Sequence, residues 1–520
     1  MKNLGSISPT REEFLTLAQK RRVIPVTVRV LADSLTPIGL YRQLAQGRPG
    51  TFLLESAAAG GVWSRHSFIG VSSPATLSTR SNGQAYWQGK IPAGLPTEGV
   101  SVEVLRDTLQ ALRTEPLPGM PPLTGGMVGF IGWECVRHWE KLPNPPADDL
   151  QLPELSMNLV ADMAAHDAAE GTVTLIANAI NFDGSDERVE QAYDDAVARL
   201  EAMLTQLDAQ LPNNAAVLSG TDVPPEELMD AVTHSWVENE YLDAIRESKK
   251  AIVDGEVFQI VVSRRFELET QASALDVYRV LRATNPSPYM YLYNFVDENG
   301  EPFQVVGSSP EALVTVNDGH VVTHPIAGSR PRGANYEEDQ LHEKSLLNDQ
   351  KERAEHLMLV DLSRNDLSKV CQAGTVEVTQ FMEVERFSHI MHLVSNVVGK
   401  TRDGVAAYDV LAATFPAGTL SGAPKPRALQ LLDKYEPYRR GVYGGVVGYL
   451  DFAGDMDMAI TIRSALLKNG RAYVQAGGGI VNDSKLADEA LETINKAAAP
   501  LRAVWASSTM RPASTIAEDK

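Results

Sequence analysis

The sequence predicts an α+β fold with antiparallel sheets, mainly because its strand-like runs come in adjacent pairs. Tyr289–Val296 is followed by Gln304–Gly307, and Leu313–Val316 is followed by His320–Thr323. Runs joined by such short connections are typical of β-hairpins. Helix-like stretches mix with these strands without the regular alternation that βαβ units require. A chain of 520 residues, 43% apolar and 22% charged, has the composition of a folded soluble protein.

The remaining elements follow from the same patterns. The first third predicts strands at Val23–Val30, Thr51–Glu55, Phe68–Val71 and Val173–Ala177. An acidic helix is expected over about residues 186–207 and another helix over about 238–254. The second of these precedes Val257–Val262, an apolar run typical of a buried strand. A last helix is expected over about 485–498, and no repeat recurs at a fixed period.

A polar, proline-containing stretch predicts the main division of the chain. We expect an N-terminal tail (residues 1–20) followed by an N-terminal domain (21–210). A linker (211–234) then leads to a C-terminal domain (235–505) and a C-terminal tail (506–520).

Charge and cysteine content exclude several classes of protein. The net charge of −20 argues against binding to nucleic acid or to an anionic membrane, since both need a basic surface. Two cysteines, Cys135 and Cys371, are too few for a disulfide framework and suit a reducing compartment. The first residues contain no apolar run of signal-peptide length, and no stretch approaches a membrane span. We therefore expect a cytoplasmic protein.

Two predicted helices carry carboxylates on one face. Glu352 and Glu355 are three residues apart, and Glu489, Glu492 and Lys496 share a face because of their three- and four-residue spacing. Carboxylates on two helices suit a hard cation such as Mg²⁺. The alternative is that both faces are solvated surface, which is the usual role of acidic residues on helices.

Glycines and isolated charges mark a second kind of feature. Gly477–Gly479 follow the predicted strand Arg471–Gln475, and we expect a turn whose backbone N–H groups approach an anion. The spacing excludes a dinucleotide fingerprint. Glu311, His392 and Arg463 lie in otherwise apolar strand sequence, where a charge needs a partner. Structural ion pairs and a site for a charged small molecule both remain open.

Taken in order, these segments resemble the chorismate-utilising enzymes, and within them the large subunits of anthranilate synthase. The strong match covers about residues 235–500, through the segments 255–265, 285–290, 307–311, 325–333, 354–367, 418–424, 441–445, 476–479 and 492–496. A weaker match covers 20–165, through Leu53–Ser56 and Gly125–Phe130. The chain departs from the family at Ser329, where Thr is usual, and at Gly478, where Ala is usual.

The resemblance implies antiparallel sheets packed face to face with helices outside, and it assigns roles to residues. Glu355 and Glu492 would bind Mg²⁺, which would hold the ring carboxylate of chorismate. Glu311 would be the general acid and His392 would serve the aromatising step. The groups expected to bind chorismate are Gly328, Ser329, Tyr443, Arg463, Gly477, Gly478, Gly479 and Lys496.

The resemblance also suggests that Gln259 selects ammonia as the nucleophile. Isochorismate synthases, which add water to the same ring carbon, carry a lysine at this position, and a buried lysine with a lowered pKa can act as a general base. Ammonia needs no such base. The alternative is that Gln259 only completes hydrogen bonds in a buried strand.

A regulatory site and a partner are implied as well. The expected tryptophan-feedback site is lined by Leu54, Glu55, Ser56, Pro288, Tyr289 and Met290. Neither Cys135 nor Cys371 lies in the turn of a glutaminase nucleophile, so ammonia would come from glutamine on a separate amidotransferase subunit, component II.

Two other functions compete with this one. Aminodeoxychorismate synthase component I of the folate branch shares nearly every motif. Ala327 favours the tryptophan branch, because many folate-branch relatives carry a lysine there. The other is a catalytically dead amino-acid sensor, against which the presence of Glu311, Glu355, His392 and Glu492 argues.

Overall fold

The structure is a computed structural model that describes residues 4–57, 65–209, 215–219, 221–234, 236–386 and 390–517. Residues 211–214 and 220 of the expected linker, and the ends of both expected tails, lie outside this description. Among the described residues, no helix is both long and apolar enough to cross a membrane.

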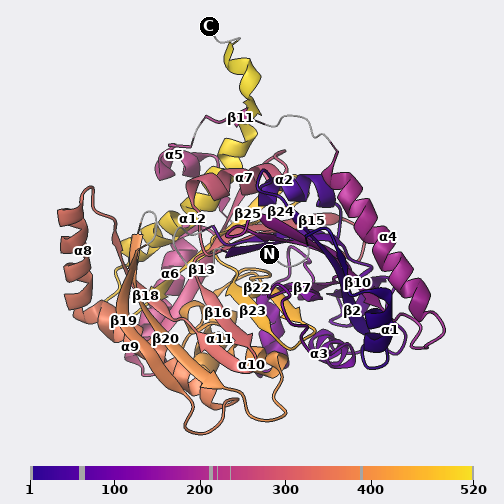
Figure 1. Cartoon of the computed structure of the whole chain (residues 1–520). Helices are drawn as coiled ribbons and strands as arrows, with labels where there is room; N and C mark the ends of the chain where they lie inside the picture. The colour runs from indigo at the N-terminus through magenta and orange to yellow at the C-terminus, as the bar shows by residue number, and fades with distance from the viewer. Residues whose placement is uncertain are drawn as a thin grey trace.

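Two large antiparallel sheets form the centre of the molecule (Figure 1). In the described residues the first sheet follows the order β1 (Ile7–Ser8), β2 (Val23–Leu31), β10 (Thr172–Ile180), β9 (Asp162–Asp167), β4 (His66–Ser72), β3 (Phe52–Glu55), β14 (Tyr289–Val296), β15 (Pro302–Ser309), β24 (Ser464–Lys468), β25 (Arg471–Ile480), β13 (Gln259–Glu269) and β12 (Thr233–His234). The short strand β21 (Gly422–Ala423) also pairs with β13.

The second sheet follows the order β18 (Ile326–Pro331), β20 (Ile390–Lys400), β17 (His320–Thr323), β16 (Ala312–Asn317), β23 (Met456–Ile460), β22 (Val446–Asp451), β7 (Gly126–Ile131), β8 (Leu155–Leu159), β5 (Ala75–Thr79) and β6 (Ala85–Gly89). Strand β19 (Glu377–Arg386) pairs with β20 as well. Each large sheet therefore contains strands from both sides of the stretch at 211–234.

The sheets pack face to face through an aromatic-rich core. Phe130 of the second sheet contacts Phe295 of the first, with ring centroids 5.4 Å apart in an edge-to-face arrangement. Phe52, Phe303 and Val447 are buried in the same cluster. Burial of such large side chains between two sheets is the main stabilising contribution of this architecture. The predicted α+β fold with antiparallel sheets packed face to face is confirmed.

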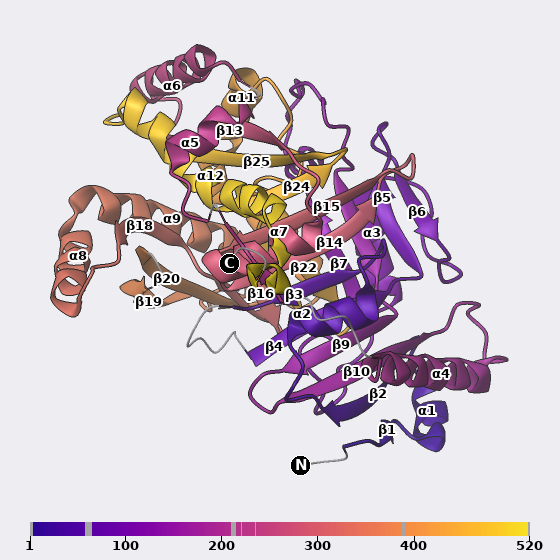
Figure 2. The same ribbon diagram turned by 90° about the horizontal axis from the view of Figure 1, so that it is seen from above.

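Helices cover the outer faces of the sheets (Figure 2). On the first sheet these are α4 (Val189–Leu207), α7 (Ala274–Thr284) and α12 (Leu486–Ser508), and on the second they include α9 (Gln350–Ser368) and α10 (Ala407–Thr414). The short helix α8 (Tyr336–Asn348) lies at the periphery in both views. The other α-helices of the described residues are α1 (Arg11–Ala18), α2 (Pro37–Leu40), α3 (Ser101–Ala111), α5 (Pro225–Asp230), α6 (Glu238–Val253) and α11 (Lys425–Tyr435).

Several local expectations differ from the structure. Gly477–Gly479 do not form a turn: they continue strand β25 and pair with Val261–Ser263 of β13, because a second strand completes their hydrogen bonds. The last helix extends to Ser508, ten residues beyond the expected end. The segment expected to be an N-terminal tail contains α1, and it contains β1, which pairs with β2.

Candidate active site and regulatory cavity

The glycine run of β25 lies at the centre of the candidate active site. A Cβ atom on Gly479 would lie 2.6 Å from Nε2 of Gln259, and one on Gly478 would lie 2.9 Å from Oε2 of Glu489. A Cβ on Gly477 would come within 3.0 Å of the Tyr443 hydroxyl. The glycines are therefore required by close approach, since any side chain would displace the polar groups around them.

The two expected metal ligands come from different helices that face this strand. Glu355 on α9 accepts a hydrogen bond of 2.9 Å from Nε2 of Gln259, and burial raises the pKa of Glu355. Glu492 on α12 forms an ion pair of 2.6 Å with Lys496, one turn later on the same helix. Lys496 in turn donates to the backbone oxygen of Gly477 over 2.9 Å. Both carboxylates thus belong to one polar cluster.

Glu489 is a third carboxylate in this cluster. Its Oε2 atom is buried and has no hydrogen-bond partner among the described residues. Burial raises the pKa of Glu489, and the neighbouring charge of Glu492 adds to the effect. In the sequence, Glu489 stands on the acidic face of this helix without an assigned role, because periodicity cannot show which carboxylate lacks a partner.

These oxygen donors fit a magnesium ion. Within the described ranges, no three Asp, Glu, His or Cys side chains already form a closed metal cluster. Mg²⁺ usually takes only one or two protein carboxylates and completes its octahedron with water and substrate oxygens. Glu355 and Glu492, with the unpartnered Oε2 of Glu489 nearby, supply a donor set of that kind.

Arg463, one of the groups expected to bind the substrate, lies beside Lys496 of the same polar cluster. Arg463 is a non-glycine residue with a positive φ of 54°, and its Nη1 donates to the backbone oxygen of Lys496 over 2.8 Å. Burial lowers the pKa of Arg463. In the described part of the chain no carboxylate forms an ion pair with this guanidinium. The charge of Glu492 acts on Arg463 from farther away, and a buried cation without a direct ion pair is suited to binding an anionic ligand.

Gly328, Ser329 and His392 come together on adjacent strands β18 and β20. Nδ1 of His392 lies 2.9 Å from the backbone oxygen of Gly328, and Ser329 pairs with His392 in the sheet. Burial lowers the pKa of His392, which favours a neutral imidazole. Gly328 has a φ of +70°, which a side chain would strain, and a Cβ there would lie 3.1 Å from Glu352.

Glu311 is the most strongly perturbed acid of the site. It is 8% exposed, and Thr419 donates a hydrogen bond of 3.1 Å to its Oε1 atom. Burial raises its pKa to about 8. The charge of Lys496 acts on Glu311, Glu355 and His392, so all three residues lie within electrostatic range of this one lysine. Their assigned roles stay predictions, but the structure brings them together.

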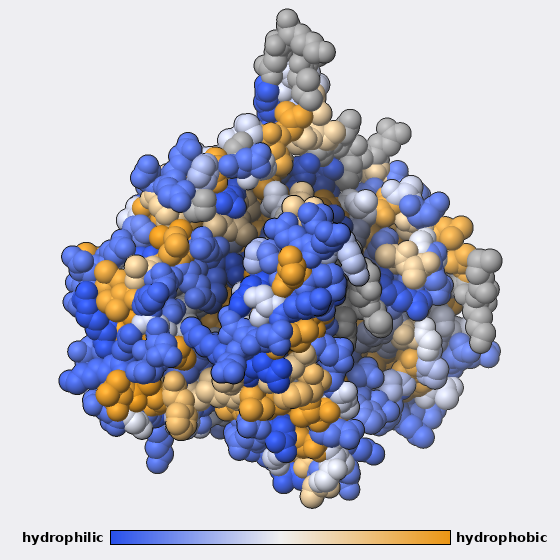
Figure 3. Space-filling view, turned by 90° about the vertical axis from the view of Figure 1, so that its left-hand side faces the viewer, coloured by the Kyte–Doolittle hydropathy of each residue, from blue (hydrophilic) through white to orange (hydrophobic). Residues whose placement is uncertain are grey.

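Figure 3 shows the face of the molecule on the side of α8 and α9. It is mainly hydrophilic, with scattered hydrophobic patches. The exposed hydrophobic side chains of the described chain include Tyr336 and Leu341 on α8 and Leu357 on α9.

A second cavity, of about 570 Å³, lies between the two sheets. All six residues expected to bind tryptophan line it: Leu54, Glu55, Ser56, Pro288, Tyr289 and Met290. They meet because β3 pairs with β14, which sets Glu55 opposite Met290. The carboxylate of Glu55 is engaged by Tyr278 and Arg282 of α7, at 2.8 Å and 2.6 Å.

Two buried polar side chains of this cavity remain available for hydrogen bonding. The hydroxyl of Ser56 and Oδ1 of Asp457 are buried and have no hydrogen-bond partner among the described residues. Burial raises the pKa of Asp457 to about 6, and Tyr289 hydrogen-bonds to its carboxyl group. Unpaired buried polar groups are costly, so a ligand or ordered water is the expected partner. Asp457 was not predicted as a site residue, although it is a charge within apolar strand sequence, which is the signal that indicated Glu311.

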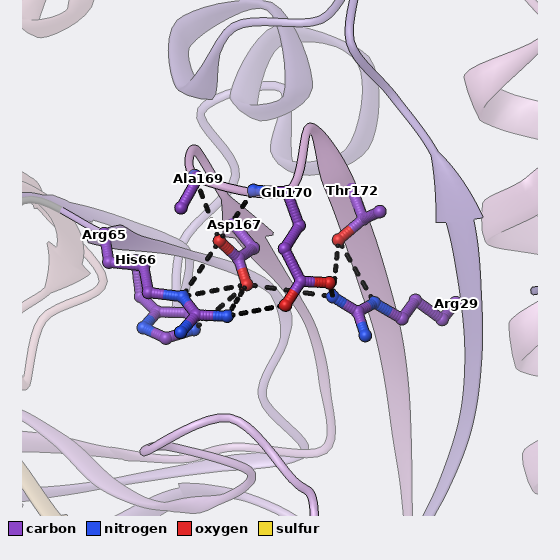
Figure 4. Close-up of polar contacts among 7 residues, drawn as sticks. All are labelled: Arg29, Arg65, His66, Asp167, Ala169, Glu170 and Thr172. Atoms are coloured by element: carbon purple, nitrogen blue, oxygen red, sulfur yellow. Dashed lines mark hydrogen bonds and ion pairs between the residues drawn. The ribbon is translucent and has the colours of Figure 1, made fainter. Parts of the chain in front are cut away.

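The wall of this cavity near His66 is fixed by an ion-pair network (Figure 4). Arg65 forms ion pairs of 2.7 Å with Asp167 and 2.8 Å with Glu170, and Arg29 pairs with Glu170 over 2.6 Å. Asp167 also accepts the backbone N–H of Ala169. The network ties β4 to the turn between β9 and β10, and so holds the neighbouring His66 in position.

Known proteins of one family resemble this chain over nearly its whole length. A family model described as chorismate binding enzyme matches residues 36–502. The chain belongs to the chorismate-binding enzymes. It is 66% identical over 504 residues to anthranilate synthase component 1 of Arthrobacter globiformis, with 97% of this chain and 94% of that protein covered. The same enzyme of Mycolicibacterium smegmatis is 54% identical, with 96% and 94% covered. The chain therefore falls in the anthranilate synthase component 1 group of that family.

Solved structures support the fold of this chorismate-binding enzyme. The crystal structure of anthranilate synthase component I from Streptococcus pneumoniae matches with a TM-score of 0.72 and 33% identity, covering 91% of this chain and 99% of that one. The menaquinone-specific isochorismate synthase of Escherichia coli matches with a TM-score of 0.68 at 18% identity, covering 95% and 98%. The second likeness concerns the fold alone.

Proposed function

We propose that this chorismate-binding enzyme converts chorismate and ammonia to anthranilate and pyruvate, the first step of tryptophan biosynthesis. The observation that carries the proposal is that Lys496 connects an acid and a cation: its charge acts on Glu311, which has a pKa of about 8, and its backbone oxygen accepts from the buried guanidinium of Arg463. An acid that is still protonated at neutral pH and a cation without an ion-pair partner suit a dianionic substrate with a poor leaving group.

The proposed first step joins ammonia to ring carbon 2 while the hydroxyl leaves ring carbon 4. Arg463, Tyr443 and Lys496 would bind the two carboxylates with the backbone of Gly328, Ser329 and Gly477–Gly479. Glu311 would give its proton to the departing hydroxyl, which leaves as water, and the new ammonium group would lose a proton. Gln259 is neutral, so the place where ammonia arrives does not carry a second cation from this residue.

The second step would remove the proton from carbon 2, break the ether bond at carbon 3 and release pyruvate after protonation of the enol carbon. His392 is our candidate for this step, because its lowered pKa keeps the imidazole neutral and able to accept a proton. Mg²⁺ held by Glu355 and Glu492 would supply Lewis-acid withdrawal of electrons through the ring carboxylate. Glu489 is a further candidate to orient this cluster.

Ammonia is proposed to come from glutamine on a separate amidotransferase subunit, component II. Both cysteines of this chain are free and buried, and burial raises the pKa of each thiol. A raised pKa opposes the thiolate that a glutaminase nucleophile needs. Free, buried thiols are also in keeping with a cytoplasmic location.

Tryptophan is proposed to inhibit from the cavity between the sheets. The Ser56 hydroxyl and the Asp457 carboxylate are suited to its ammonium group, and Tyr289 and Met290 to its indole ring. Strand β23 links this cavity to the active site: Asp457 lies near one end, and at the other the backbone N–H of Ile460 donates to the backbone oxygen of Glu311 over 3.0 Å. A shift of β23 on tryptophan binding would therefore move the general acid.

The test is the product formed from chorismate, Mg²⁺ and ammonium by the purified chain. Fluorescent anthranilate and equimolar pyruvate are expected. Accumulation of an aminated but non-aromatic product without pyruvate would instead assign the chain to the folate-branch reaction. Absence of any chorismate consumption would contradict the proposed function.

A further inference from the structure

A small cavity, separate from the one that Ser56 lines, lies against Glu311. It has a volume of about 40 Å³, which is enough for a water molecule or two. Glu311 and Thr419 line it together with Thr323, His324 and Ser363. The cavity thus joins the proposed general acid to a histidine that the reaction steps above do not use.

His324 is held by polar partners from two strands. Nδ1 is hydrogen-bonded to the side-chain oxygen of Asn396 on β20, and Nε2 lies 3.7 Å from the carboxylate of Glu385 on β19. Burial lowers the pKa of His324, but the bonds to Glu385 and Asn396 outweigh it, and the pKa is raised overall. The carboxylate behind the ring therefore favours the imidazolium form.

The remaining charged groups around this cavity are balanced. Asp366 lines it, but this carboxylate is paired with Lys425 at 3.0 Å and with Lys369 at 2.9 Å. His356 on α9 interacts with His324 but has a pKa lowered to about 4 by burial, so it is neutral near pH 7. Lys496 acts on Glu311 from the substrate side. His324 is thus the cation on the cavity side of Glu311 among the described residues.

We propose that His324, backed by Glu385, is a positioning residue that holds positive charge across this cavity and strengthens Glu311 as an acid. The proposal rests on the proposed role of Glu311 in protonating the leaving hydroxyl. Glu311 becomes a buried carboxylate when it gives up its proton, and an unpaired buried charge is costly. An imidazolium across a small polar cavity lowers that cost.

The experiment compares the pH dependence of kcat for the parent chain, His324→Gln and Glu385→Gln, with chorismate, Mg²⁺ and ammonia at saturation. Free ammonia is held constant across the pH range. Gln at position 324 keeps a hydrogen-bonding group for Asn396 but carries no charge. Loss of the cation should raise the pKa of Glu311. The decrease of kcat at alkaline pH, its alkaline limb, should therefore occur about one pH unit higher than in the parent. A weaker acid should also lower the plateau of kcat roughly threefold or more.

Glu385→Gln should shift the alkaline limb in the same direction by a smaller amount. The side chain of Glu385 is half-exposed, so this substitution should leave the fold intact. Glu377→Gln, an exposed carboxylate on the same strand, is the matched control and should change nothing. KM for chorismate should stay within twofold in all variants, because none of these residues contacts substrate. His324→Lys, which restores a cation, should return the limb toward its parental position.

An alkaline limb that stays in place in both folded variants would overturn the inference, as would a change in KM alone. These outcomes are separate from the proposed function. If the parent chain forms no anthranilate, the proposed function is wrong. If the parent forms anthranilate and the pH dependence of the variants is the same as that of the parent, only the role of His324 is rejected.

Discussion

Gln259 donates a hydrogen bond from Nε2 to Oε1 of Glu355 over 2.9 Å. The residue expected to select the nucleophile therefore also orients one of the two expected metal ligands. Gln259 is 3% exposed, and a Cβ on the neighbouring Gly479 would collide with its amide nitrogen. A substitution here must consequently affect the carboxylate as well as the nucleophile.

Gln259→Lys should lower anthranilate formation and produce some isochorismate. The lysine would pair with Glu355 as well as act as a base toward water, so the concentration of Mg²⁺ needed for half-maximal rate should rise. Both products are measured by chromatography at several magnesium concentrations. Parental anthranilate formation with no hydroxylated product would show that nucleophile choice resides elsewhere in the pocket.

Glu355→Gln and Glu492→Gln should each abolish most turnover while the chain stays folded. Each change removes one oxygen charge that a divalent ion requires, and magnesium binding measured by calorimetry should weaken with it. Glu337→Gln on α8, an exposed carboxylate, is the control. Full activity in excess chelator would refute the metal requirement.

Glutamine alone should not support turnover by the isolated chain, whereas ammonium should do so at a pH where free ammonia is present. Burial raises the pKa of both Cys135 and Cys371, and neither thiol is suited to attack glutamine. Anthranilate fluorescence with each nitrogen source gives the answer. Glutamine-dependent synthesis by the purified chain without a second subunit would contradict the prediction.

Ser56→Arg should weaken inhibition by tryptophan, because the larger side chain fills the cavity and adds a positive charge beside the expected ammonium group. Asp457→Asn should weaken tryptophan binding too. Since the pKa of Asp457 is about 6, its carboxylate is present above that pH, and affinity should fall as the pH drops through 6. Calorimetric titration at pH 5.5 and 7.5 measures this. Unchanged inhibition in Ser56→Arg would mean that tryptophan binds elsewhere.

Glu311→Gln should reduce kcat by about a hundredfold or more, the usual contribution of a general acid. The parent enzyme should lose activity as the pH rises through about 8, since Glu311 must be protonated to act and its pKa is near that value. Stopped assays from pH 6 to 9.5 at constant free ammonia measure this alkaline decrease in kcat. If the alkaline limb persists unchanged in Glu311→Gln, the titration of another group must cause it.

The local patterns of the sequence were sufficient to predict the hairpins and to identify the family. Tyr289–Val296 and the strand after it have the alternation and short connection that predict an antiparallel pair, and β14 and β15 pair in that way. The same holds for the carboxylates on α9 and α12, whose helical spacing is visible in the sequence. These features depend on neighbours a few residues apart, and the resemblance in its ordered motifs supplied the candidate roles.

Only the tertiary structure decided which of these groups meet. Gly477–Gly479 form strand rather than turn because β13, more than two hundred residues earlier, completes their hydrogen bonds. Asp457 faces the cavity of Ser56, and His324 shares a cavity with Glu311, because sheet pairing brings distant strands together. The pKa of Glu311 likewise depends on burial, which arises from packing of the whole chain. Sequence periodicity shows the face on which a residue lies, but partners and burial depend on contacts between remote segments.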